Sequence, residues 1–497
     1  MSLIKKLAGE TALYGLGNIL NRVLNYLIVT PYLTYVFNDD QGEYGIHGIM
    51  YAFAALLMVI LTYGLETAFF RFASDKTYNL ASVLSTAVLS IFSTTLIFVG
   101  LIVYFAVPLA DFLTRPEDWS YVVLFACIVG LDVLAAIPFA HLRHQNRPVR
   151  FVAIKAVNVV TNGIFIVLLL EIFPWAVQKG WLDMPVFLDK SQRLYFVFIA
   201  NLAASALTFG MLSPALLRIQ PVFDIALWKK MMHYALPLVV VGIAGMINQL
   251  ADRYLISRWM PGTPEENLVS SGIYSAAARI AVLLNLFTQA FRYAAEPFFF
   301  RHAAEDDSRE IYGQVGKIFT IVGGLTFLGI LFYLDLIQYL IGSNFREGLR
   351  IVPILLMAYL LLGLYFNFSI WYKLADFTMA GAIIALGGVV ITLLMNAYLI
   401  PQMGYEGAAW SALACFGFMA IAGYLSGQWF YPIAYPVARM LAYIGLSLGL
   451  YGISLWLRQK MDAQLLPVLV VNTALLLLYL TIVFFAERKP KLKRENS

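Results

Sequence analysis

The sequence NLFTQAFRYAAEPFFFR, residues 285–301, lies in an apolar run long enough to cross a bilayer, yet it carries several polar side chains. Four of them are Asn285, Gln289, Arg292 and Glu296. Their spacing places them along one stripe of an α-helix. Because ionisable groups are costly at membrane depth, they usually face a bundle interior or a wet cavity. The stretch therefore predicts a membrane helix with one face turned toward protein or a cavity.

The composition of the whole chain is that of a polytopic membrane protein. Of its 497 residues, 61% are hydrophobic and only 13% are charged, and the mean hydropathy is +0.77. Soluble proteins are about a quarter charged. No polar stretch is long enough to fold as a separate soluble domain. Cys127 and Cys415 both lie in apolar runs, where we interpret them as small buried hydrophobic residues.

Apolar runs of about 20 residues predict fourteen transmembrane helices. The expected class is therefore an all-α integral membrane protein. The predicted spans are 8–36, 44–72, 80–107, 119–141, 150–173, 193–217, 228–259, 268–300, 310–334, 349–373, 377–400, 406–428, 434–457 and 464–487. The first, second, seventh and eighth are long enough to bend or to project beyond the hydrocarbon.

The distribution of Lys and Arg predicts the orientation. These residues concentrate in the loops on the side of the two termini and in the basic tail 487–494, whereas the acidic loops 38–43 and 116–118 lie on the other side. We therefore expect both termini in the cytoplasm of a bacterial inner membrane. The net charge of +5 reflects this topology, and it gives no indication of nucleic-acid binding.

An internal repeat appears when the chain is shifted by 230 residues. Within 63–73, six of the eleven residues are identical to those at 293–303, including both a Glu and an Arg. Each repeat holds six predicted helices, an even number, so both repeats have the same orientation in the membrane. We expect an N-lobe at 1–222, a C-lobe at 223–430, and two further helices with a basic tail at 431–497. Two parallel lobes around a central site is the plan of an alternating-access transporter.

The predicted membrane helices carry arginines that could bind phosphate. Guanidinium groups form bidentate hydrogen bonds with phosphate oxygens. The candidate substrate-binding residues are Asn18, Arg22, Asn25, Arg253, Arg279, Asn285, Gln289 and Arg292. The alternative is that these residues pair with other side chains and hold helices together. Asn285, Gln289 and Arg292 have no polar equivalent other than Thr62 in the first repeat, so we expect this part of the stripe to contact substrate.

Three further polar residues are candidates for coupling to an ion. Asp252 and Asn248 lie one turn apart and offer oxygen atoms to a sodium ion, or a carboxylate to a proton. Asp132 is a second candidate for a proton or cation. Pairing between Asp252 and Arg253 is awkward because adjacent side chains on a helix point about 100° apart.

The Glu and Arg that the repeat preserves are Glu66, Arg71, Glu296 and Arg301. Their presence in both halves favours a structural or gating role over substrate-specific contact. Glu296 precedes Pro297, which predicts a bend or a helix end at that point.

Nothing in the sequence indicates enzyme chemistry. There is no Walker A, HExxH, CxxC or GxSxG motif, and the five histidines show no metal-ligand spacing. We expect no enzymatic activity and no cofactor. With no nucleotide site, the energy for transport would come from a sodium or proton gradient, the membrane potential or a substrate gradient.

Several segments resemble the polysaccharide-flippase branch of the multidrug/oligosaccharidyl-lipid/polysaccharide exporter superfamily. They are LNRVLNYLIVTPYLTYVF, YGLETAFFRFAS, ALPLVVVGIAGMINQLADRYLISRWMP, NFREGLRIVPILL and YEGAAWSALACF. The resemblance implies two six-helix lobes around a cationic cavity and an undecaprenyl-diphosphate-linked oligosaccharide as substrate. In lipid II flippases, arginines on the first and eighth helices face the cavity and the seventh helix carries a sodium site. This implies roles for Arg22, for Arg279 or Arg292, and for Asn248 and Asp252.

We therefore expect a flippase that moves a lipid-linked oligosaccharide to the periplasmic leaflet. Its expected partners are that substrate, membrane lipid, a glycan polymerase and glycosyltransferases, and we expect a monomer. The alternatives are a lipid II flippase, a multidrug antiporter of the same fold, and a non-transporting scaffold for glycan assembly.

Overall fold

The computed structural model describes residues 29–75, 77–145, 147–216, 221–301, 308–375, 377–461 and 464–488. Every regular element in these ranges is a helix, which confirms the all-α class. Thirteen helical stretches within them are long and apolar enough to cross a membrane, and they correspond to the second to fourteenth predicted spans. The first predicted span lies mainly outside the described residues; its end is α2 (Thr30–Val36).

The chain divides into two compact units. Unit 1 comprises residues 1–276, 342–347 and 382–412, and unit 2 comprises 277–341, 348–381 and 413–497. The division of the chain at residues 222 and 430 stays a prediction. The principal helices after α2 are α3 (Gln41–Thr62), α4 (Leu65–Ser74), α5 (Leu80–Tyr104), α6 (Ala106–Leu113), α7 (Trp119–His144), α8 (Pro148–Val167), α9 (Phe173–Gln178), α10 (Arg193–Leu216), α11 (Ile225–Trp259), α12 (Pro264–Arg301), α13 (Ser308–Phe332), α14 (Leu334–Ile337), α15 (Val352–Phe368), α16 (Ile370–Leu374), α17 (Thr378–Met403), α18 (Tyr405–Phe430), α19 (Val437–Lys460) and α20 (Leu465–Glu487).

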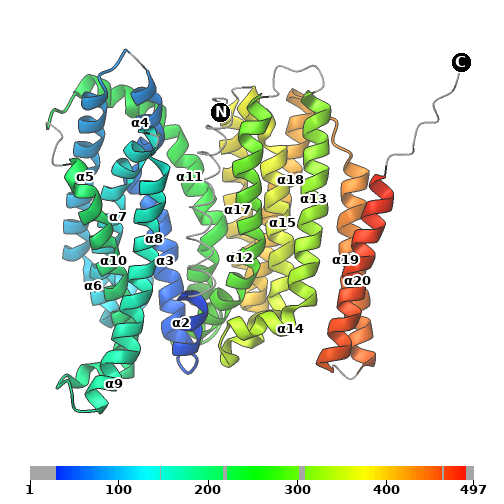
Figure 1. Ribbon diagram of the computed structural model, residues 1–497, viewed down its shortest axis with the longest axis horizontal. Helices are drawn as coiled ribbons and strands as arrows, with labels where there is room; N and C mark the ends of the chain where they lie inside the picture. The colour runs from blue at the N-terminus through cyan, green and yellow to red at the C-terminus, as the bar shows by residue number, and fades with distance from the viewer. Residues whose placement is uncertain are drawn as a thin grey trace, which may run out of the picture. The chain divides into compact units, whose positions relative to one another are not determined.

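In unit 1, α7 is the central helix. It packs against α4, α5, α8 and α10 (Figure 1). Apolar side chains from α7, α8 and α10 form a buried cluster that includes Phe139, Phe151 and Leu212. Most of the described part of the predicted N-lobe is therefore organised around one buried helix.

The second predicted span is broken into α3 and α4 at two residues with left-handed backbone. Tyr63 has φ 30° and Gly64 has φ 70°. A Cβ atom on Gly64 would lie 2.9 Å from the Ala235 carbonyl oxygen, so the break also brings two backbones together. Its equivalent in the second repeat is Ala294, and there α12 continues without a break.

α12 also continues through Pro297 to Arg301, so of the two predicted alternatives the helix end is wrong, and the bend stays a prediction. Proline removes a single backbone donor, and long membrane helices tolerate it because neighbouring groups satisfy the freed carbonyl. The seventh and eighth spans are long, as predicted: α11 has 35 residues and α12 has 38.

In unit 2, one ion pair attaches α20 to α13 and another attaches α19 to α14. The buried Lys317 ammonium pairs with the Glu487 carboxylate, which also accepts a hydrogen bond from the Tyr443 hydroxyl at 2.6 Å. The Arg458 guanidinium of α19 lies 2.7 Å from the Asp335 carboxylate of α14, the short helix that follows α13. Figure 1 shows α19 and α20 beside one another after α13. The two helices outside the repeat are thus part of unit 2.

Candidate ion and substrate sites

A buried polar cluster surrounds Asp252 on α11. Its carboxylate accepts a hydrogen bond from the Tyr274 hydroxyl of α12 at 2.7 Å and another from the Asn396 amide of α17 at 3.1 Å. Asp252 is 3% exposed and Asn396 is fully buried. Three helices of unit 1 therefore converge on a single carboxylate at membrane depth.

Asn248 lies one helical turn before Asp252 and extends the cluster. Its amide donates to the Ala385 carbonyl oxygen at 3.1 Å, and its side-chain oxygen accepts from the Thr392 hydroxyl at 3.1 Å. The side-chain oxygen of Asn396 has no hydrogen-bond partner among the described residues although it is buried. The structure thus brings together the two residues that the sequence grouped for ion coupling.

The donor set of this cluster consists of oxygen atoms: one carboxylate, hydroxyls and amide carbonyls. Oxygen donors suit hard cations such as sodium, and a lone buried carboxylate can also carry a proton. The described residues contain no group of three or more His, Cys, Asp or Glu that could hold a metal ion. A site with one acidic residue fits a monovalent ion better than a divalent one.

Asp132, the other predicted coupling residue, has a different partner. Its carboxylate on α7 accepts a hydrogen bond from the Ser205 hydroxyl of α10 at 2.8 Å. The Asp252 cluster, in contrast, is built from α11, α12 and α17. Asp132 is therefore a separate, half-buried carboxylate of unit 1.

Arg253 follows Asp252 but is held mainly by neighbouring backbone and side-chain packing. It is 9% exposed, and its guanidinium donates to the Gln249 carbonyl oxygen at 3.4 Å. Its own carbonyl accepts from the Ser271 hydroxyl at 2.9 Å. These contacts favour the structural alternative over phosphate binding for this arginine.

The predicted substrate residues on α12, which are Arg279, Asn285, Gln289 and Arg292, lie in unit 2. Asn285 is buried, and Arg279, Gln289 and Arg292 are half-buried. The Arg292 guanidinium lies over the ring of Phe366 on α15, 4.8 Å from its centroid. The predicted substrate residues Asn18, Arg22 and Asn25 lie outside the described residues.

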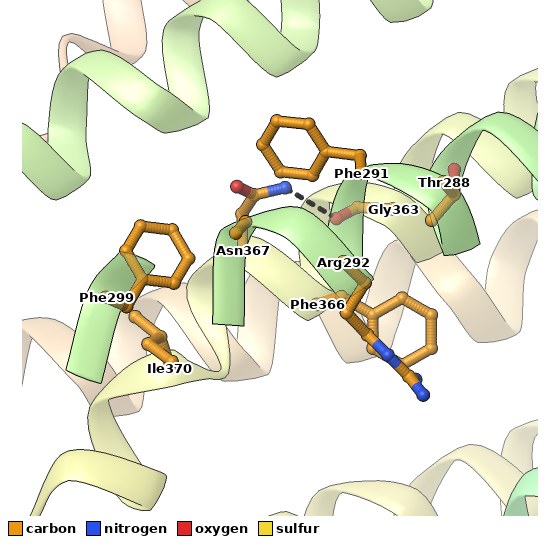
Figure 2. A pocket seen from close by; sticks show the side chains of 9 residues that line it. Thr288, Phe291, Arg292, Phe299, Gly363, Phe366, Asn367 and Ile370 are labelled. Atoms are coloured by element: carbon orange, nitrogen blue, oxygen red, sulfur yellow. Dashed lines mark hydrogen bonds between the residues drawn. The ribbon is translucent and has the colours of Figure 1, made fainter. Parts of the chain in front are cut away.

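A small pocket adjoins Arg292. Its free volume is about 10 Å³, roughly the room that a single water requires. The lining residues come from α12, α15 and the start of α16, and they are Thr288, Phe291, Arg292, Ala295, Phe299, Gly363, Phe366, Asn367 and Ile370. Figure 2 shows the Asn367 amide nitrogen directed at the Gly363 carbonyl, while the Arg292 guanidinium extends past Phe366.

Tyr435, in the connection between α18 and α19, supports this region from outside the membrane-spanning helices. Its hydroxyl donates to the Asn367 carbonyl oxygen at 3.0 Å. Burial raises the pKa of Tyr435, so the hydroxyl stays protonated as the donor. The backbone of Asn367 is thereby fixed.

A second pocket, of about 210 Å³, lies in unit 1 between α3, α11 and α17. Its walls are almost wholly apolar and include Phe53, Met246, Leu250, Tyr254 and Leu393. None of its described lining residues is a phosphate-binding group, so the pocket suits only a hydrocarbon group.

The predicted gating residues of the first repeat do not pair with each other. The Glu66 carboxylate pairs with the Arg143 guanidinium of α7. The Arg71 guanidinium lies over the ring of Tyr234 on α11, 4.3 Å from its centroid. In the second repeat, the backbones of Glu296 and Arg301 belong to α12, and their side chains are outside the described parts of the structure.

The family model described as "Polysaccharide biosynthesis protein" matches residues 7–302. The chain belongs to this family. No curated protein matches its sequence.

Solved structures agree on the fold of this polysaccharide biosynthesis family member. A structure of lipid II flippase MurJ in an inward closed conformation is 15% identical, with a TM-score of 0.73, and the match covers 95% of this chain and 99% of that one. An inward-facing multidrug resistance MATE family transporter of the MOP superfamily is 12% identical, with a TM-score of 0.64, over 88% of this chain and 96% of that one. The predicted resemblance to the flippase branch of this superfamily is confirmed, and the protein is a multi-pass membrane protein with a flippase fold.

Several residues of both sites were not among those predicted from the sequence. Thr392 and Asn396, four residues apart in an apolar run, form a polar face on α17 of the kind that identified the other stripes. Tyr274 and Thr288 gave no such signal, since single hydroxyl residues are common in membrane helices. Asn367 is an isolated amide at the end of α15, and only its neighbours in space identify it.

Proposed function

We propose that the protein moves an undecaprenyl-diphosphate-linked oligosaccharide from the cytoplasmic to the periplasmic leaflet of a bacterial inner membrane by alternating access. Both termini would lie in the cytoplasm. The observation that carries the proposal is Arg292, a guanidinium at membrane depth held over Phe366 beside a pocket with polar groups. Guanidinium groups suit diphosphate, and the prenyl chain would stay in lipid.

The Asp252 cluster supports coupling to an ion gradient. Its buried carboxylate and surrounding oxygens would bind a sodium ion or a proton in one conformation and release it in the other. Tyr274 and Asn396 would orient the carboxylate, because each donates a hydrogen bond to one of its oxygens. No nucleotide-binding motif in the sequence offers another source of energy.

The test is translocation of a fluorescent lipid-linked oligosaccharide in proteoliposomes. We expect the double variant Arg22→Gln/Arg292→Gln to translocate at least about tenfold more slowly, since loss of a charge-assisted hydrogen bond is worth roughly a factor of ten or more. Arg150→Gln, at an exposed position near the start of α8, serves as a matched control and should keep the wild-type rate. A wild-type rate in the double variant would refute a phosphate-binding role for these arginines.

The MATE-like fold keeps a multidrug antiporter as the second candidate. A binding site for cationic drugs needs negative charge, whereas the candidate substrate residues on α12 include two arginines, Arg279 and Arg292, and no acidic residue. Export of a cationic dye by the same proteoliposomes, without any lipid translocation, would favour the antiporter. A lipid II flippase differs from the leading proposal only in its head group, so lipid II belongs among the substrates assayed.

A further inference from the structure

The connection between α8 and α10 is longer than its equivalent in the second repeat. α17 begins 230 positions after α8, as the repeat predicts, but α18 begins only 212 positions after α10. The first repeat therefore contains 18 additional residues at this point. In the second repeat a single residue, Gly404, joins α17 to α18. The additional residues are not part of the architecture that the two repeats share, so they require an explanation of their own.

These residues form an ordered structure, which we call the 172–192 hairpin. α9 continues from the end of α8, and the 3₁₀ turn Pro185–Leu188 folds back against it (Figure 1). The ring of Phe187 lies 5.0 Å from that of Phe173 and 5.0 Å from that of Phe196 on α10, measured between centroids. These aromatic contacts give the hairpin a packed inner side.

Both ends of the hairpin are attached to α2. The Glu171 carboxylate, just before the hairpin, accepts a hydrogen bond from the Tyr32 hydroxyl at 2.7 Å. The Arg193 guanidinium, just after it, donates to the Val36 carbonyl oxygen at 3.0 Å. The hairpin is therefore held at its base as well as in its interior.

The outer side of the hairpin is apolar. Trp175 is 47% exposed and Trp181 is 74% exposed, and their rings lie 4.9 Å apart. Met184, Val186 and Leu188 are exposed as well. Residues 172–192 contain two lysines and two aspartates, so they carry no net charge. A loop in water is usually polar, and a clustered apolar surface of this kind marks an interaction site.

The length of the helix that leads into the hairpin places this surface at a membrane boundary. Residues 148–178 form one candidate span. Trp175 follows Arg150 by 25 positions, or about 38 Å of helix, and a bilayer with its headgroups is about 40–45 Å thick. With Arg150 in one headgroup layer, Trp175 therefore reaches the other. Ile164 and Ile172 are exposed between them on the same side of the helix as Trp175, so the lipid-facing surface continues into the hairpin.

We propose that the 172–192 hairpin lies in the headgroup layer of the bilayer and binds lipid through Trp175, Trp181 and the exposed apolar side chains of 184–188. The layer is the one at which the first and third spans also end. Tryptophan is enriched at this depth, and apolar side chains of interfacial segments are buried there by roughly 5–10 Å. Because the hairpin has no net charge, burial of apolar surface stabilises the contact and anionic lipid is not required. The inference is independent of which substrate the protein moves.

Spin labels on single cysteines test the position of the hairpin in nanodiscs of phosphatidylcholine. The full chain with Cys127→Ala/Cys415→Ala is the background, and the label is attached after Trp181→Cys or Leu188→Cys. Oxygen concentrates in lipid and a nickel chelate stays in water, so the accessibility of the label to each reagent reports its surroundings. We expect both labels to be several-fold more accessible to oxygen, relative to the chelate, than a label in water.

Two further positions calibrate the measurement. Glu117→Cys supplies the water reference, since the Glu117 side chain is 69% exposed in the loop where the third span ends. Ile164→Cys supplies the lipid reference, and the hairpin labels should lie between the two. Thermal unfolding shows whether each variant is folded, and Val186→Cys replaces a hairpin site whose substitution prevents folding.

Lipid composition tests the expected independence from charge. Nanodiscs that contain phosphatidylglycerol should give the same accessibility ratios for the hairpin labels as phosphatidylcholine alone. Insertion that occurs only with phosphatidylglycerol would mean that the hairpin is held by Lys179 and Lys190, and it would overturn a contact made by the apolar side chains.

Two other results also overturn the proposal. Hairpin labels that are as accessible to the nickel chelate as the label at Glu117 would show that the hairpin stands in water. Hairpin labels that neither reagent reaches would show that protein covers the surface, either a second copy of the chain or a partner. All of these results leave the proposed transport function untouched, because none of them measures translocation.

Discussion

The Glu66 carboxylate on α4 forms an ion pair with the Arg143 guanidinium on α7, 77 positions later in the chain. The same guanidinium lies over the rings of Phe70 and Phe151, 4.9 and 5.7 Å from their centroids. The pair follows directly after the break at Tyr63 and Gly64, so it fixes the direction in which α4 leaves the break. At the repeat offset, Arg143 corresponds to Lys373 and Glu66 to Glu296, so the sequence supplies the same charges in the second half.

Exchange of the two charges tests this pair. Glu66→Arg alone would place two cations together, and we expect it to lower the free energy of unfolding and the melting temperature in detergent. Both partners are partly exposed, with side-chain exposures of 42% and 28%, so neutralising the pair by Glu66→Gln should cost only about 0.2–1 kcal/mol. The double variant Glu66→Arg/Arg143→Glu should recover most of the loss. No recovery in the double variant would show that the contribution comes from the stacking of Arg143 on the rings.

Gly64→Ala should destabilise the protein by about 1–3 kcal/mol, because an L-residue at φ 70° is strained and its Cβ would lie 2.9 Å from the Ala235 carbonyl oxygen. Gly100→Ala on α5 is the control, since a Cβ at Gly100 has no other described atom within 4 Å and alanine is the better helix former. Thermal unfolding of both purified variants gives the comparison. Equal melting temperatures for the two variants would contradict a requirement for glycine at the break.

The sequence predicted the helices well because membrane spans depend on local composition. Thirteen predicted spans have described counterparts, and α11 and α12 have the expected extra length. The sequence also indicated the break in the second span, because Gly64 of the first repeat aligns with Ala294 of the second. Pro297 does not end α12, because a long membrane helix tolerates a single proline where neighbouring groups satisfy the freed carbonyl.

The hydrogen-bond partners of the predicted site residues could not be predicted from local composition. A helical stripe shows which face of α11 carries Asp252, but Asn396 lies 144 positions away and Tyr274 lies on the next helix. Pairing across the chain depends on how helices pack, and the local pattern of a single sequence does not specify that. The same limit explains why Arg253 was grouped with the substrate arginines although it bonds to the Gln249 carbonyl.

The attachment of α20 depends on Lys317, a buried cation that is 6% exposed. Glu487→Gln removes its counter-charge, and removing one partner of a buried pair is strongly destabilising. We expect a loss of about 1–3 kcal/mol, toward the lower end of such effects because Glu487 itself is partly exposed. Lys317→Met/Glu487→Gln should be more stable than Glu487→Gln alone, since it leaves no unpaired charge. The measurement is thermal unfolding, and Asp335→Asn reports on the ion pair between α14 and α19.

Asp252→Asn should uncouple transport from the ion gradient. Asparagine keeps the size of the side chain and can still accept from the Tyr274 hydroxyl, but it carries neither the charge for a sodium ion nor a site for a proton. In proteoliposomes with an imposed sodium or proton gradient, we expect the wild-type rate of lipid translocation to rise with one of the two gradients and the rate of the variant to respond to neither. Asp75→Asn, which changes an exposed carboxylate in the loop after α4, should respond like the wild type. Asp132→Asn decides between the two candidate carboxylates: if it alone abolishes the response to the gradient, the coupling site lies with Ser205 between α7 and α10, and the assignment of Asp252 is wrong.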